Sequence, residues 1–318
     1  MCEGGRPLII LTGPTAVGKT ELSIALAKAV GGEIISADSM QVYRHMDIGS
    51  AKIMPEETGG VPHHLIDVLE PTEEFNVVVF QKLAGKAAEE IYGRGHIPVL
   101  VGGTGFYIQA LLYDIDFTEN DEDTAFRRSL SALADREGAD ALYERLRAVD
   151  PESCVNIHKN NVKRVIRAIE FYEKTGRKIS AHNEEQRKND SPYRFAYFVL
   201  NDSRERIYRR IDERVDLMMA RGLVDEVRAL KALGCHSGMV SMQGLGYKQI
   251  LACLEGEISM DEAVYLIKRD TRHFAKRQLT WFRREKEVTW IQKDVFDYDS
   301  QKILGFMQDF LREKKIIL

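Results

Sequence analysis

Short apolar runs alternate with helical patterns along the first third of the chain. Residues 8–11, 33–37 and 97–101 form apolar runs of strand length, which are typical of strands buried in a parallel sheet. Helical periodicity between them predicts helices over residues 21–30 and 75–92. Alternating strands and helices predict an α/β fold, in which a parallel sheet forms the middle of a three-layer core.

The pattern becomes helical in the middle of the chain. Residues 117–191 are acidic, rich in arginine and without a convincing strand. The helical pattern is interrupted at Gly138, Asp150-Pro151 and Thr175-Gly176-Arg177. These interruptions predict several short helices rather than one long helix.

A strand pattern returns at residues 193–200 and is followed by helices, with an interruption at residues 234–246 and a short final strand at residues 288–291. This return predicts that the helical segment is inserted into the α/β core. The expected domains are a first part of the P-loop core at residues 1–115, an all-helical insertion domain at residues 116–192, and a second part of the core with C-terminal helices at residues 193–318.

Charge and hydropathy limit which kinds of partner, nucleic acid or membrane, the protein can bind. The 318 residues carry a net charge of −4, so affinity for nucleic acid has to come from local basic surfaces. No run approaches a membrane span, and the first core strand begins by Leu8, which leaves no room for a signal peptide. We therefore expect a cytoplasmic protein with no membrane partner. We also expect a monomer, because nothing in the sequence indicates an obligate dimer.

Cysteines and histidines show no metal-binding spacing. The four cysteines are scattered, without a C-x-x-C pair or a nearby histidine pair, and are expected to be reduced thiols that are mostly buried. His63 and His64 have no partner carboxylates at ligand spacing. This favours loop or core histidines over a metal site.

The strongest chemical motif follows the first predicted strand. It reads G-x-x-x-x-G-K-[ST], the phosphate loop, and consists of Gly13, Pro14, Thr15, Ala16, Val17, Gly18, Lys19 and Thr20. Its glycines let backbone N–H groups face an anion at the N-terminus of the next helix, where the helix dipole adds positive potential. Lys19 supplies a charge for the phosphate oxygens, and the Thr20 hydroxyl is placed to hold Mg²⁺. The loop predicts binding of a di- or triphosphate, with Mg²⁺ as cofactor.

Two further strand ends carry candidate residues, because ligands of open α/β sheets lie beyond the carboxyl ends of the strands. Asp38 follows the second strand and can be a general base, a metal ligand or the cap of the next turn. The third strand runs into Gly102-Gly103-Thr104-Gly105, where most P-loop nucleotidases have an aspartate that binds Mg²⁺. The absence of that aspartate argues against an ATPase or a GTPase.

Arg206, Arg210 and Arg214 lie one helical turn apart, next to a stripe of apolar residues. Like charges at this spacing destabilise an isolated helix, and a bound anion would relieve the repulsion. The alternative is local pairing, of Asp202 with Arg206 and of Glu213 with Arg210.

A second basic face is predicted near the C-terminus, with few acidic neighbours and with Asp270 facing elsewhere. Its members are Lys268, Arg269, Arg272, His273, Lys276 and Arg277. Together with the adjacent Trp281, such a face is typical of single-stranded RNA binding through phosphate contacts and base stacking, although it can also be merely solvated. Lys163 and Arg167 form a further cationic surface in the helical segment. Two basic lobes fit a polyanion held between them.

Several motifs, in the same order along almost the whole chain, resemble the tRNA dimethylallyltransferases, also called tRNA isopentenyltransferases. Besides the phosphate loop, these motifs are Asp38-Ser39-Met40-Gln41-Val42-Tyr43, Met46-Asp47-Ile48-Gly49-Ser50-Ala51-Lys52, His63-His64-Leu65-Ile66-Asp67, Gly102-Gly103-Thr104-Gly105 and Lys276-Arg277-Gln278-Leu279-Thr280-Trp281. The resemblance implies transfer of a dimethylallyl group from dimethylallyl diphosphate to N6 of the adenosine just 3′ of the anticodon. It also implies a helical insertion domain and a channel where the flipped base meets the diphosphate. No cysteine follows Cys253, so the zinc finger of eukaryotic members is missing and the chain resembles the bacterial type.

The resemblance also implies roles for single residues. Asp38 matches the base that takes the proton from the adenine amine, and Thr104 matches a residue near the reacting base. Arg214 matches an arginine that helps to hold the diphosphate. The residues expected to contact tRNA, by this match or by their place on the basic face, are Asp38, Ser39, Met40, Gln41, Arg127, Lys163, Arg164, Arg167, Gln243, Lys248, Lys276 and Arg277.

The sequence leaves three alternative functions open. A P-loop small-molecule kinase would consume ATP and would need no RNA. A nucleotide-dependent switch that binds RNA would need a base-recognition motif such as N-K-x-D, which the sequence lacks. A prenyltransferase acting on free adenine nucleotides would keep the chemistry, but two basic lobes favour a large RNA.

Overall fold

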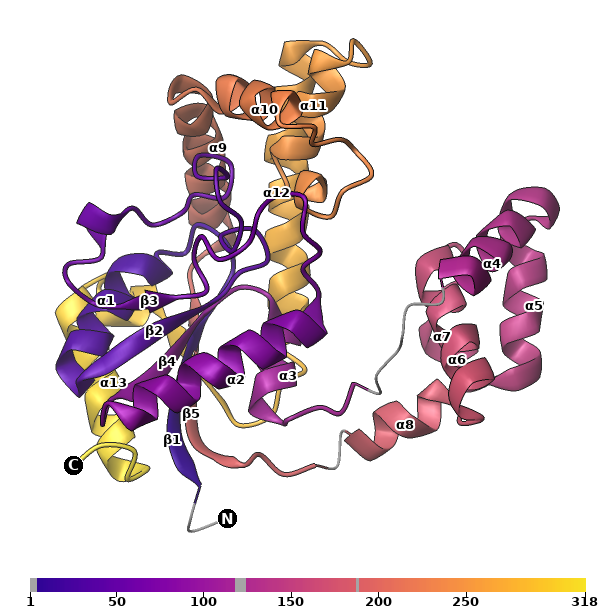
Figure 1. Ribbon diagram of the computed structural model, residues 1–318. Helices are drawn as coiled ribbons and strands as arrows, with labels where there is room; N and C mark the ends of the chain where they lie inside the picture. The colour runs from indigo at the N-terminus through magenta and orange to yellow at the C-terminus, as the bar shows by residue number, and fades with distance from the viewer. Residues whose placement is uncertain (1–4, 118–123, 187–188) are drawn as a thin grey trace. The chain divides into compact units, whose positions relative to one another are not determined.

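The computed structural model describes residues 5–117, 124–186 and 189–318 (Figure 1). The chain divides into two compact units. Met1–Asp114 and Pro192–Leu318 form the larger unit, and Ile115–Ser191 form the smaller one. The larger unit is therefore built from two stretches that are separated in the sequence by the smaller unit.

The larger unit contains a six-stranded sheet in the order β3-β2-β4-β1-β5-β6, in which all neighbouring strands are parallel. The strands are β1 (Arg6–Thr12), β2 (Gly32–Ala37), β3 (His63–His64), β4 (Ile97–Gly102), β5 (Tyr193–Asn201) and β6 (Val288–Gln292). The predicted α/β fold with a parallel sheet is confirmed. The sequence missed only β3 among these strands, because two residues are too few to show periodicity.

Helices cover both faces of this sheet (Figure 1). Alternate residues of a strand point to opposite faces, so Leu8 and Ile10 of β1 belong to one buried cluster, while Ile9 and Leu11 belong to the other. The first cluster includes side chains of α2 (Val77–Gly93), α3 (Gly105–Leu112), α9 (Arg204–Ala220), α10 (Leu223–Ala232), α11 (Tyr247–Leu254) and α12 (Met260–Phe282). The second includes side chains of α1 (Lys19–Val30) and α13 (Ser300–Glu313). The sheet is the middle of three layers, as the sequence predicted.

The carboxyl ends of the central strands lie at one edge of the sheet. Gly102 at the end of β4 is in register with Thr12 of β1 on one side and with Ala37 of β2 on the other. Because these strands are parallel, the loops that follow them leave from the same edge. The phosphate loop, Asp38 and Thr104 are therefore carried by neighbouring loops.

The smaller unit contains only helices among its described residues. They are α4 (Thr124–Glu137), α5 (Ala139–Val149), α6 (Ser153–Asn156), α7 (Val162–Thr175) and α8 (Ile179–Gln186). Leu142, Val165 and Ile169 are fully buried in its core. Gly138 precedes α5 and Gly176 follows α7, both with positive φ, as expected for glycines that interrupt a helical pattern.

Short 3₁₀ helices lie in three connections of the larger unit. They are η1 (Pro55–Glu57), η2 (Ser241–Gln243) and η3 (Lys293–Phe296). The segment that contains η2 joins α10 to α11. It corresponds to the interruption that the sequence predicted at residues 234–246.

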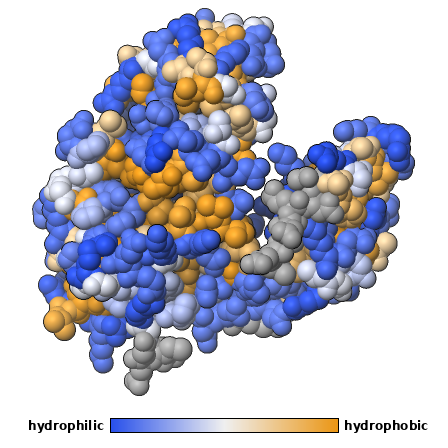
Figure 2. Space-filling view, in the orientation of Figure 1, coloured by the Kyte–Doolittle hydropathy of each residue, from blue (hydrophilic) through white to orange (hydrophobic). Residues whose placement is uncertain are grey.

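Apolar side chains gather over the middle of the larger unit on the face seen in Figure 2, while much of its periphery is hydrophilic. Across the described residues, no helix combines the length and the apolar character that a membrane crossing requires.

The carboxylate of Glu33 on β2 is the centre of an ion-pair cluster. It accepts two bonds from Arg94, each 2.8 Å long, and contacts His64 Nε2 and His96 Nδ1, each at 2.7 Å. The bond from Arg94, followed by those with the two histidines, lowers the pKa of Glu33 to about 2 against the effect of burial. The sequence spacing did not indicate this partner of His64, because Glu33 comes from the neighbouring strand.

The described cysteines are free thiols. Cys235 is buried, while Cys154 and Cys253 are only partly buried, so the expectation of mostly buried thiols was wrong for these two. Cys2 lies outside the described residues. Within the described ranges, no group of three or more His, Cys, Asp or Glu side chains is placed to hold a metal ion.

Candidate active site

The phosphate loop connects β1 to α1, as the sequence predicted. Gly13 has φ of 149°, and a Cβ atom there would lie 2.3 Å from the carbonyl oxygen of Leu200. Ala16 and Gly18 also have positive φ, of 64° and 95°. The backbone therefore curls tightly before α1 begins at Lys19, which leaves the first N–H groups of the helix available to an anion.

Lys19 Nζ donates to the carbonyl oxygens of Gly13 and Pro14, at 2.9 Å each. Burial, followed by the positive charge of Arg214, lowers the pKa of Lys19 to about 7, while Asp38 acts in the opposite direction. Two carbonyl groups of the phosphate loop therefore hold the amine of Lys19. The negative charge of a bound diphosphate would raise the pKa of Lys19 and favour its charged form.

Arg214 of α9 contacts the same loop. Its Nη1 donates to Thr15 Oγ1 at 3.1 Å. Burial lowers the pKa of Arg214, and Asp38 opposes that shift. The side chain therefore lies close to both the phosphate loop and Asp38, and its expected role in binding the diphosphate stays a prediction.

The other two arginines of this stripe differ from each other. Arg206 forms an ion pair with Asp202 at 3.4 Å, as the alternative of local pairing predicted. Glu213 pairs with Arg209 at 3.7 Å rather than with Arg210, so the second predicted pair was wrong. A Cβ atom added at Gly18 would lie 3.5 Å from Arg210 Nη2, which places Arg210 beside the phosphate loop.

Lys293 is a neighbour of the phosphate loop that sequence reasoning missed. Its Nζ donates to the carbonyl oxygen of Val17 at 3.3 Å, and a Cβ atom at Gly18 would lie 3.3 Å from it. Burial, followed by the charge of Arg210, lowers the pKa of Lys293. Its position directly after β6, at a predicted strand end, was the signal that could have found it.

Gln278 of α12 is a second residue that was not assigned to the site. Its Oε1 accepts the backbone N–H of Thr15 at 2.9 Å, and its Nε2 donates to the carbonyl oxygen of Gly103 at 2.9 Å. One buried side chain thus joins the loops that follow β1 and β4. Gln278 belongs to the motif at residues 276–281, although that motif alone does not indicate this contact.

Asp38 follows β2 and caps the next turn. Its Oδ1 accepts the backbone N–H groups of Met40, at 2.8 Å, and Gln41, at 3.3 Å. Within the described part of the chain, the structure gives Asp38 Oδ2 no hydrogen bond. The capping role is therefore present, and it leaves one carboxylate oxygen available for proton transfer.

Thr104 lies beside Asp38. Its backbone N–H donates to the carbonyl oxygen of Ala37 at 3.4 Å, and it precedes α3 without using its side chain as a cap. The residue is only partly buried. Its backbone therefore lies next to the residue that precedes Asp38, and its hydroxyl group does not cap the helix.

Much of the predicted basic face on α12 is neutralised by acidic residues. Lys268 pairs with Asp216 and Arg272 with Asp212, at 2.6 Å each, and both aspartates belong to α9. The sequence could not show that the opposing helix supplies carboxylates at the same spacing. The expectation of few acidic neighbours was therefore wrong for these two cations.

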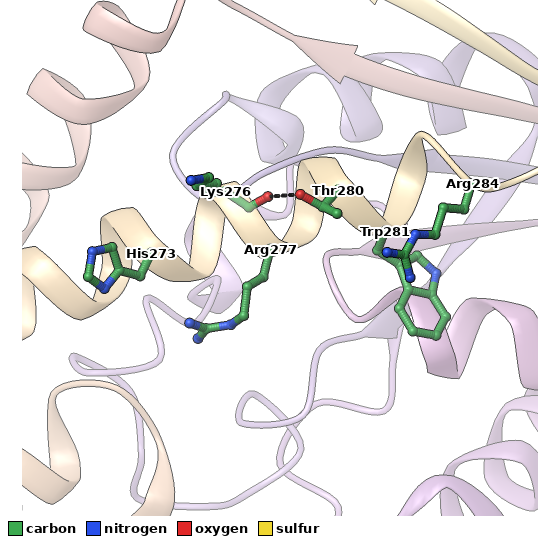
Figure 3. A pocket seen from close by; sticks show the side chains of 6 residues that line it. All are labelled: His273, Lys276, Arg277, Thr280, Trp281 and Arg284. Atoms are coloured by element: carbon green, nitrogen blue, oxygen red, sulfur yellow. Dashed lines mark hydrogen bonds between the residues drawn. The ribbon is translucent and has the colours of Figure 1, made fainter. Parts of the chain in front are cut away.

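Arg269 contacts Asp270 at 2.8 Å, so the expectation that Asp270 faces elsewhere was also wrong. His273, Lys276 and Arg277 remain. Together with Thr280, Trp281 and Arg284 they line an open pocket at the end of α12 (Figure 3). This smaller surface keeps the combination of cations with an aromatic ring.

The other residues expected to contact tRNA in the larger unit lie on irregular segments or at the start of a helix. Ser39, Met40 and Gln41 are partly buried after Asp38, while Gln243 and Lys248 are exposed at η2 and at the beginning of α11. Gln243 Nε2 donates to the carbonyl oxygen of Ser237. A Cβ atom at Gly244 would lie 2.6 Å from Met40 Sδ, so the segment that begins with Gln243 packs against the residues that follow Asp38.

The smaller unit carries the remaining predicted tRNA residues. Lys163 and Arg164 are exposed at the first turn of α7 and Arg167 is partly buried one turn later. Arg127 Nε contacts both carboxylate oxygens of the buried Glu170, at 2.9 and 3.0 Å. Arg127 therefore has a structural ion pair in addition to any part in RNA binding.

Thr20 is exposed in the first turn of α1. Its hydroxyl group is a hard oxygen ligand that fits Mg²⁺, which usually keeps several waters and binds through few protein groups together with substrate phosphates. The residues present therefore fit a Mg²⁺ ion that arrives with a diphosphate.

Comparison with known families agrees with this arrangement. A model of the IPP transferase family matches residues 41–285. A model of the isopentenyl transferase family matches residues 7–67, which include the phosphate loop and Asp38.

Related chains and structures cover nearly the whole sequence. The tRNA dimethylallyltransferases of Lachnoclostridium phytofermentans and Acetivibrio thermocellus are 62% and 48% identical to it, each over 98% of this chain and 99% of the relative. The full-length tRNA isopentenylpyrophosphate transferase of Bacillus halodurans is 43% identical, with a TM-score of 0.73 over 98% of both chains. A eukaryotic dimethylallyltransferase, in a study of its action on tRNA, is 30% identical, with a TM-score of 0.82 over 97% of this chain and 80% of that one. The family model and these relatives show that the chain belongs to the IPP transferase family, that of the tRNA dimethylallyltransferases.

Proposed function

We propose that this protein transfers a dimethylallyl group from dimethylallyl diphosphate to N6 of the adenosine 3′-adjacent to the anticodon of tRNA. Membership of the family supports the reaction class, and the site supports the chemistry. The observation that carries the proposal is the position of Asp38 beside two cations of the diphosphate site. Its charge acts on the pKa of both Lys19 and Arg214. The proposed base therefore lies close to the cations that would hold the diphosphate.

The chain's own groups favour departure of the diphosphate. As the allylic C–O bond breaks, negative charge grows on the diphosphate oxygens. The N–H groups of the phosphate loop, Lys19 and Arg214 are fixed donors around that charge, which is how preorganised sites lower a barrier. Thr20 would hold Mg²⁺, and a bound Mg²⁺ supplies further positive charge to the diphosphate.

Asp38 accounts for the other half of the reaction. The N6 nitrogen attacks the allylic carbon and loses a proton, which the carboxylate of Asp38 accepts. Oδ1 is held by the N–H groups of Met40 and Gln41, so the orientation of the carboxylate is fixed. Thr104, at the next strand end, is placed to contact the adenine or its amine.

Recognition of tRNA is assigned to several surfaces. On the larger unit these are residues 39–41, Gln243 and Lys248, and the pocket at the end of α12. On the smaller unit they are Arg127, Lys163, Arg164 and Arg167. Extruding a base from a loop costs a few kcal/mol of unstacking, which phosphate contacts to such cations can offset. A tRNA substrate also supports a cytoplasmic location.

The test is incubation with Mg²⁺, radiolabelled dimethylallyl diphosphate and an unmodified tRNA that has adenosines on both sides of the target position. Nuclease digestion and mass analysis then locate the label. We expect label on the single adenosine 3′ of the anticodon. Label on free adenine nucleotides alone would identify a different acceptor, and phosphorylation of a small molecule by ATP without labelled RNA would favour a kinase.

A further inference from the structure

The segment that follows Asp38 has no regular secondary structure of its own. Residues 38–52 contain turns and an isolated bridge from Tyr43 to Leu69, and His45 and Ala51 have positive φ. Turns satisfy some of its backbone N–H groups, such as those of Tyr43, Ala51 and Lys52, and the others need partners outside the segment. The position of Asp38 therefore depends on what holds these residues.

Glu226 of α10 holds the middle of the segment. Its Oε2 accepts the N–H groups of Asp47, at 2.9 Å, and Ile48, at 2.7 Å, and its Oε1 accepts that of Gly49 at 3.0 Å. Bonds from N–H groups to a charged carboxylate are about twice as strong as bonds between neutral groups. Three consecutive backbone groups are thus fixed by a side chain that lies far away in the sequence.

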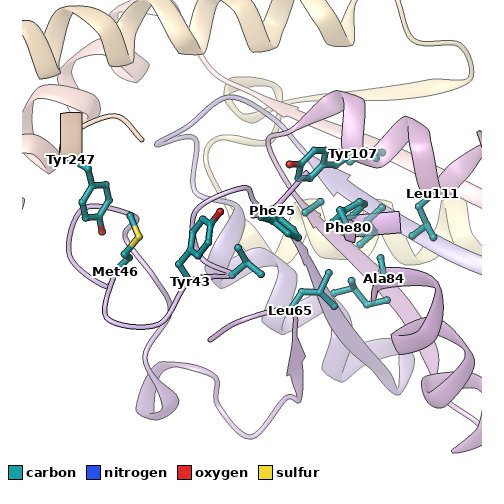
Figure 4. Close-up of a cluster of buried hydrophobic side chains, with 14 of the residues drawn as sticks. Tyr43, Met46, Leu65, Phe75, Phe80, Ala84, Tyr107, Leu111 and Tyr247 are labelled. Carbon is teal, nitrogen blue, oxygen red and sulfur yellow. The ribbon is translucent and has the colours of Figure 1, made fainter. Parts of the chain in front are cut away.

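Tyr247 of α11 completes this contact. Its hydroxyl donates to Glu226 Oε1 at 2.8 Å and accepts the N–H of Ser50 at 3.1 Å. The ring is fully buried and lies beside Met46 (Figure 4). A Cβ atom at Gly49 would lie 2.5 Å from the ring, so the backbone passes directly over it. Burial, followed by the carboxylate of Glu226, raises the pKa of Tyr247 well above its usual value, so the hydroxyl stays a donor.

Two side chains, those of Gln41 and Lys52, connect the residues held by this clamp of Glu226 and Tyr247 to the chain that follows Asp38. Gln41 Nε2 donates to the carbonyl oxygen of Ala51 at 3.3 Å, while the backbone N–H of Gln41 donates to Asp38 Oδ1 at 3.3 Å. Lys52 Nζ, which is buried, donates to Asp47 Oδ1 at 2.6 Å and to the carbonyl oxygen of Tyr43 at 2.7 Å. Hydrogen bonds of Gln41 therefore join residue 51 to the turn that Asp38 caps.

We infer that Glu226, together with Tyr247, positions Asp38 for proton removal by fixing the backbone of residues 47–50. The inference rests on the proposed function, in which Asp38 is the base. Neither Glu226 nor Tyr247 contacts substrate in this account, and both act through the segment. Their effect should therefore appear in the chemical step and should depend on Asp38.

The variant Glu226→Gln tests the charge and both acceptor atoms with little change in shape. Each carboxylate oxygen accepts two donors, so the amide NH₂ faces donors in either orientation. Tyr247→Phe removes only the hydroxyl and serves if the first variant fails to fold. Asp225→Asn is the matched control, because Asp225 lies on the same turn, is exposed and pairs only with Arg228 among the described residues, at 2.6 Å.

The measurements are the single-turnover rate of prenyl transfer at saturating substrates, the Kd for tRNA, and amide hydrogen exchange over residues 38–52. We expect Glu226→Gln and Tyr247→Phe to lower the rate by roughly tenfold to a hundredfold, as misplaced catalytic groups do, with faster exchange and a tRNA Kd within about threefold of wild type. In an Asp38→Ala background the same changes should lower the rate by less than about threefold, because residues that act as a unit are not additive. Asp225→Asn should keep the wild-type rate.

A rate within about threefold of wild type for both variants would overturn the inference, as would an equal loss in the Asp38→Ala background, which would indicate an effect independent of the base. Unchanged hydrogen exchange over residues 38–52 would also overturn it. If the wild-type protein transfers no label to tRNA, the proposed function fails and the catalytic role of Glu226 fails with it. Hydrogen exchange would still report whether the clamp holds the segment, so the two failures are distinguishable.

Discussion

Gln278 holds the phosphate loop at Thr15, whose backbone N–H donates to Gln278 Oε1 at 2.9 Å. The same carboxamide donates to the carbonyl oxygen of Gly103 at 2.9 Å. Since Lys276 and Arg277 precede Gln278 on α12, the helix assigned to tRNA contact also fixes the phosphate loop and the loop that carries Thr104. A single helix therefore links the binding sites proposed for the two substrates.

Replacing Gln278 should weaken diphosphate binding. Gln278→Leu leaves the partly buried N–H of Thr15 and carbonyl of Gly103 without their partner, and loss of such a partner costs up to about 1 to 3 kcal/mol when the group is buried. We expect the Kd for dimethylallyl diphosphate to rise by about tenfold, measured by calorimetry. Glu262→Gln, in the first turn of the same helix, is the control and should bind as wild type does. Equal affinities for both variants would contradict the structural role of Gln278.

Asp38 can be tested separately as a cap and as a base. Asp38→Asn keeps an oxygen that can accept from Met40 and Gln41, whereas Asp38→Ala removes it. We expect both variants to lower single-turnover prenylation by at least about a hundredfold, as loss of a general base does, with tRNA binding nearly intact. If Asp38→Asn reacted within about threefold of wild type, Asp38 would not be the base.

The ion pairs on α12 predict which cations matter for RNA binding. Lys276 and Arg277 line the exposed pocket, whereas Lys268 and Arg272 are paired with aspartates of α9. Lys276→Ala with Arg277→Ala should weaken tRNA binding and reduce the slope of log K against log salt by about one for each lost phosphate contact. Lys268→Ala with Arg272→Ala should leave that slope nearly unchanged. Filter binding at several salt concentrations measures both, and equal slopes for the two double variants would refute the assignment.

The lowered pKa of Lys19 predicts that the protein takes up a proton when diphosphate binds. Its pKa in the free protein is lowered to about 7, and the bound anion favours the charged form. At about pH 6 the amine is already charged, so little uptake is expected. At about pH 8 the free amine is mostly neutral, so binding should take up close to one proton and affinity should fall between these pH values.

Calorimetry in two buffers of different ionisation enthalpy measures this uptake. Lys19→Met should abolish its pH dependence. Uptake that is the same at both pH values in the wild-type protein would argue that Lys19 is charged in the free state.

The sequence predicted most of the core because buried strands and periodic helices leave local signals. Thr20 followed from the phosphate-loop motif, and the strand ends before Asp38 and Thr104 followed from the rule that ligands bind beyond the carboxyl ends of parallel strands. These positions depend on the order of elements and not on which helices pack together. The sequence could therefore place them without tertiary contacts.

Contacts between distant segments could not be predicted in this way. The aspartates that neutralise Lys268 and Arg272 come from another helix, and the partner of His64 comes from a neighbouring strand. Gln278 and Lys293 reach the phosphate loop from the other end of the chain. Each of these depends on how helices and strands pack, which periodicity in one segment does not indicate.

The smaller unit separates the strands of the sheet along the sequence, and this separation determines when the phosphate loop can form during synthesis. β1 ends at Thr12, but its partner β5 ends at Asn201, after the whole smaller unit has been made. Local helical contacts form faster than pairings between distant residues, and domains fold as units while the chain is being synthesised. We therefore expect the nascent chain to fold its helical insertion first. Because the loop at Gly13 packs against Leu200, the anion site at the start of the chain is among the last parts of the protein to be completed.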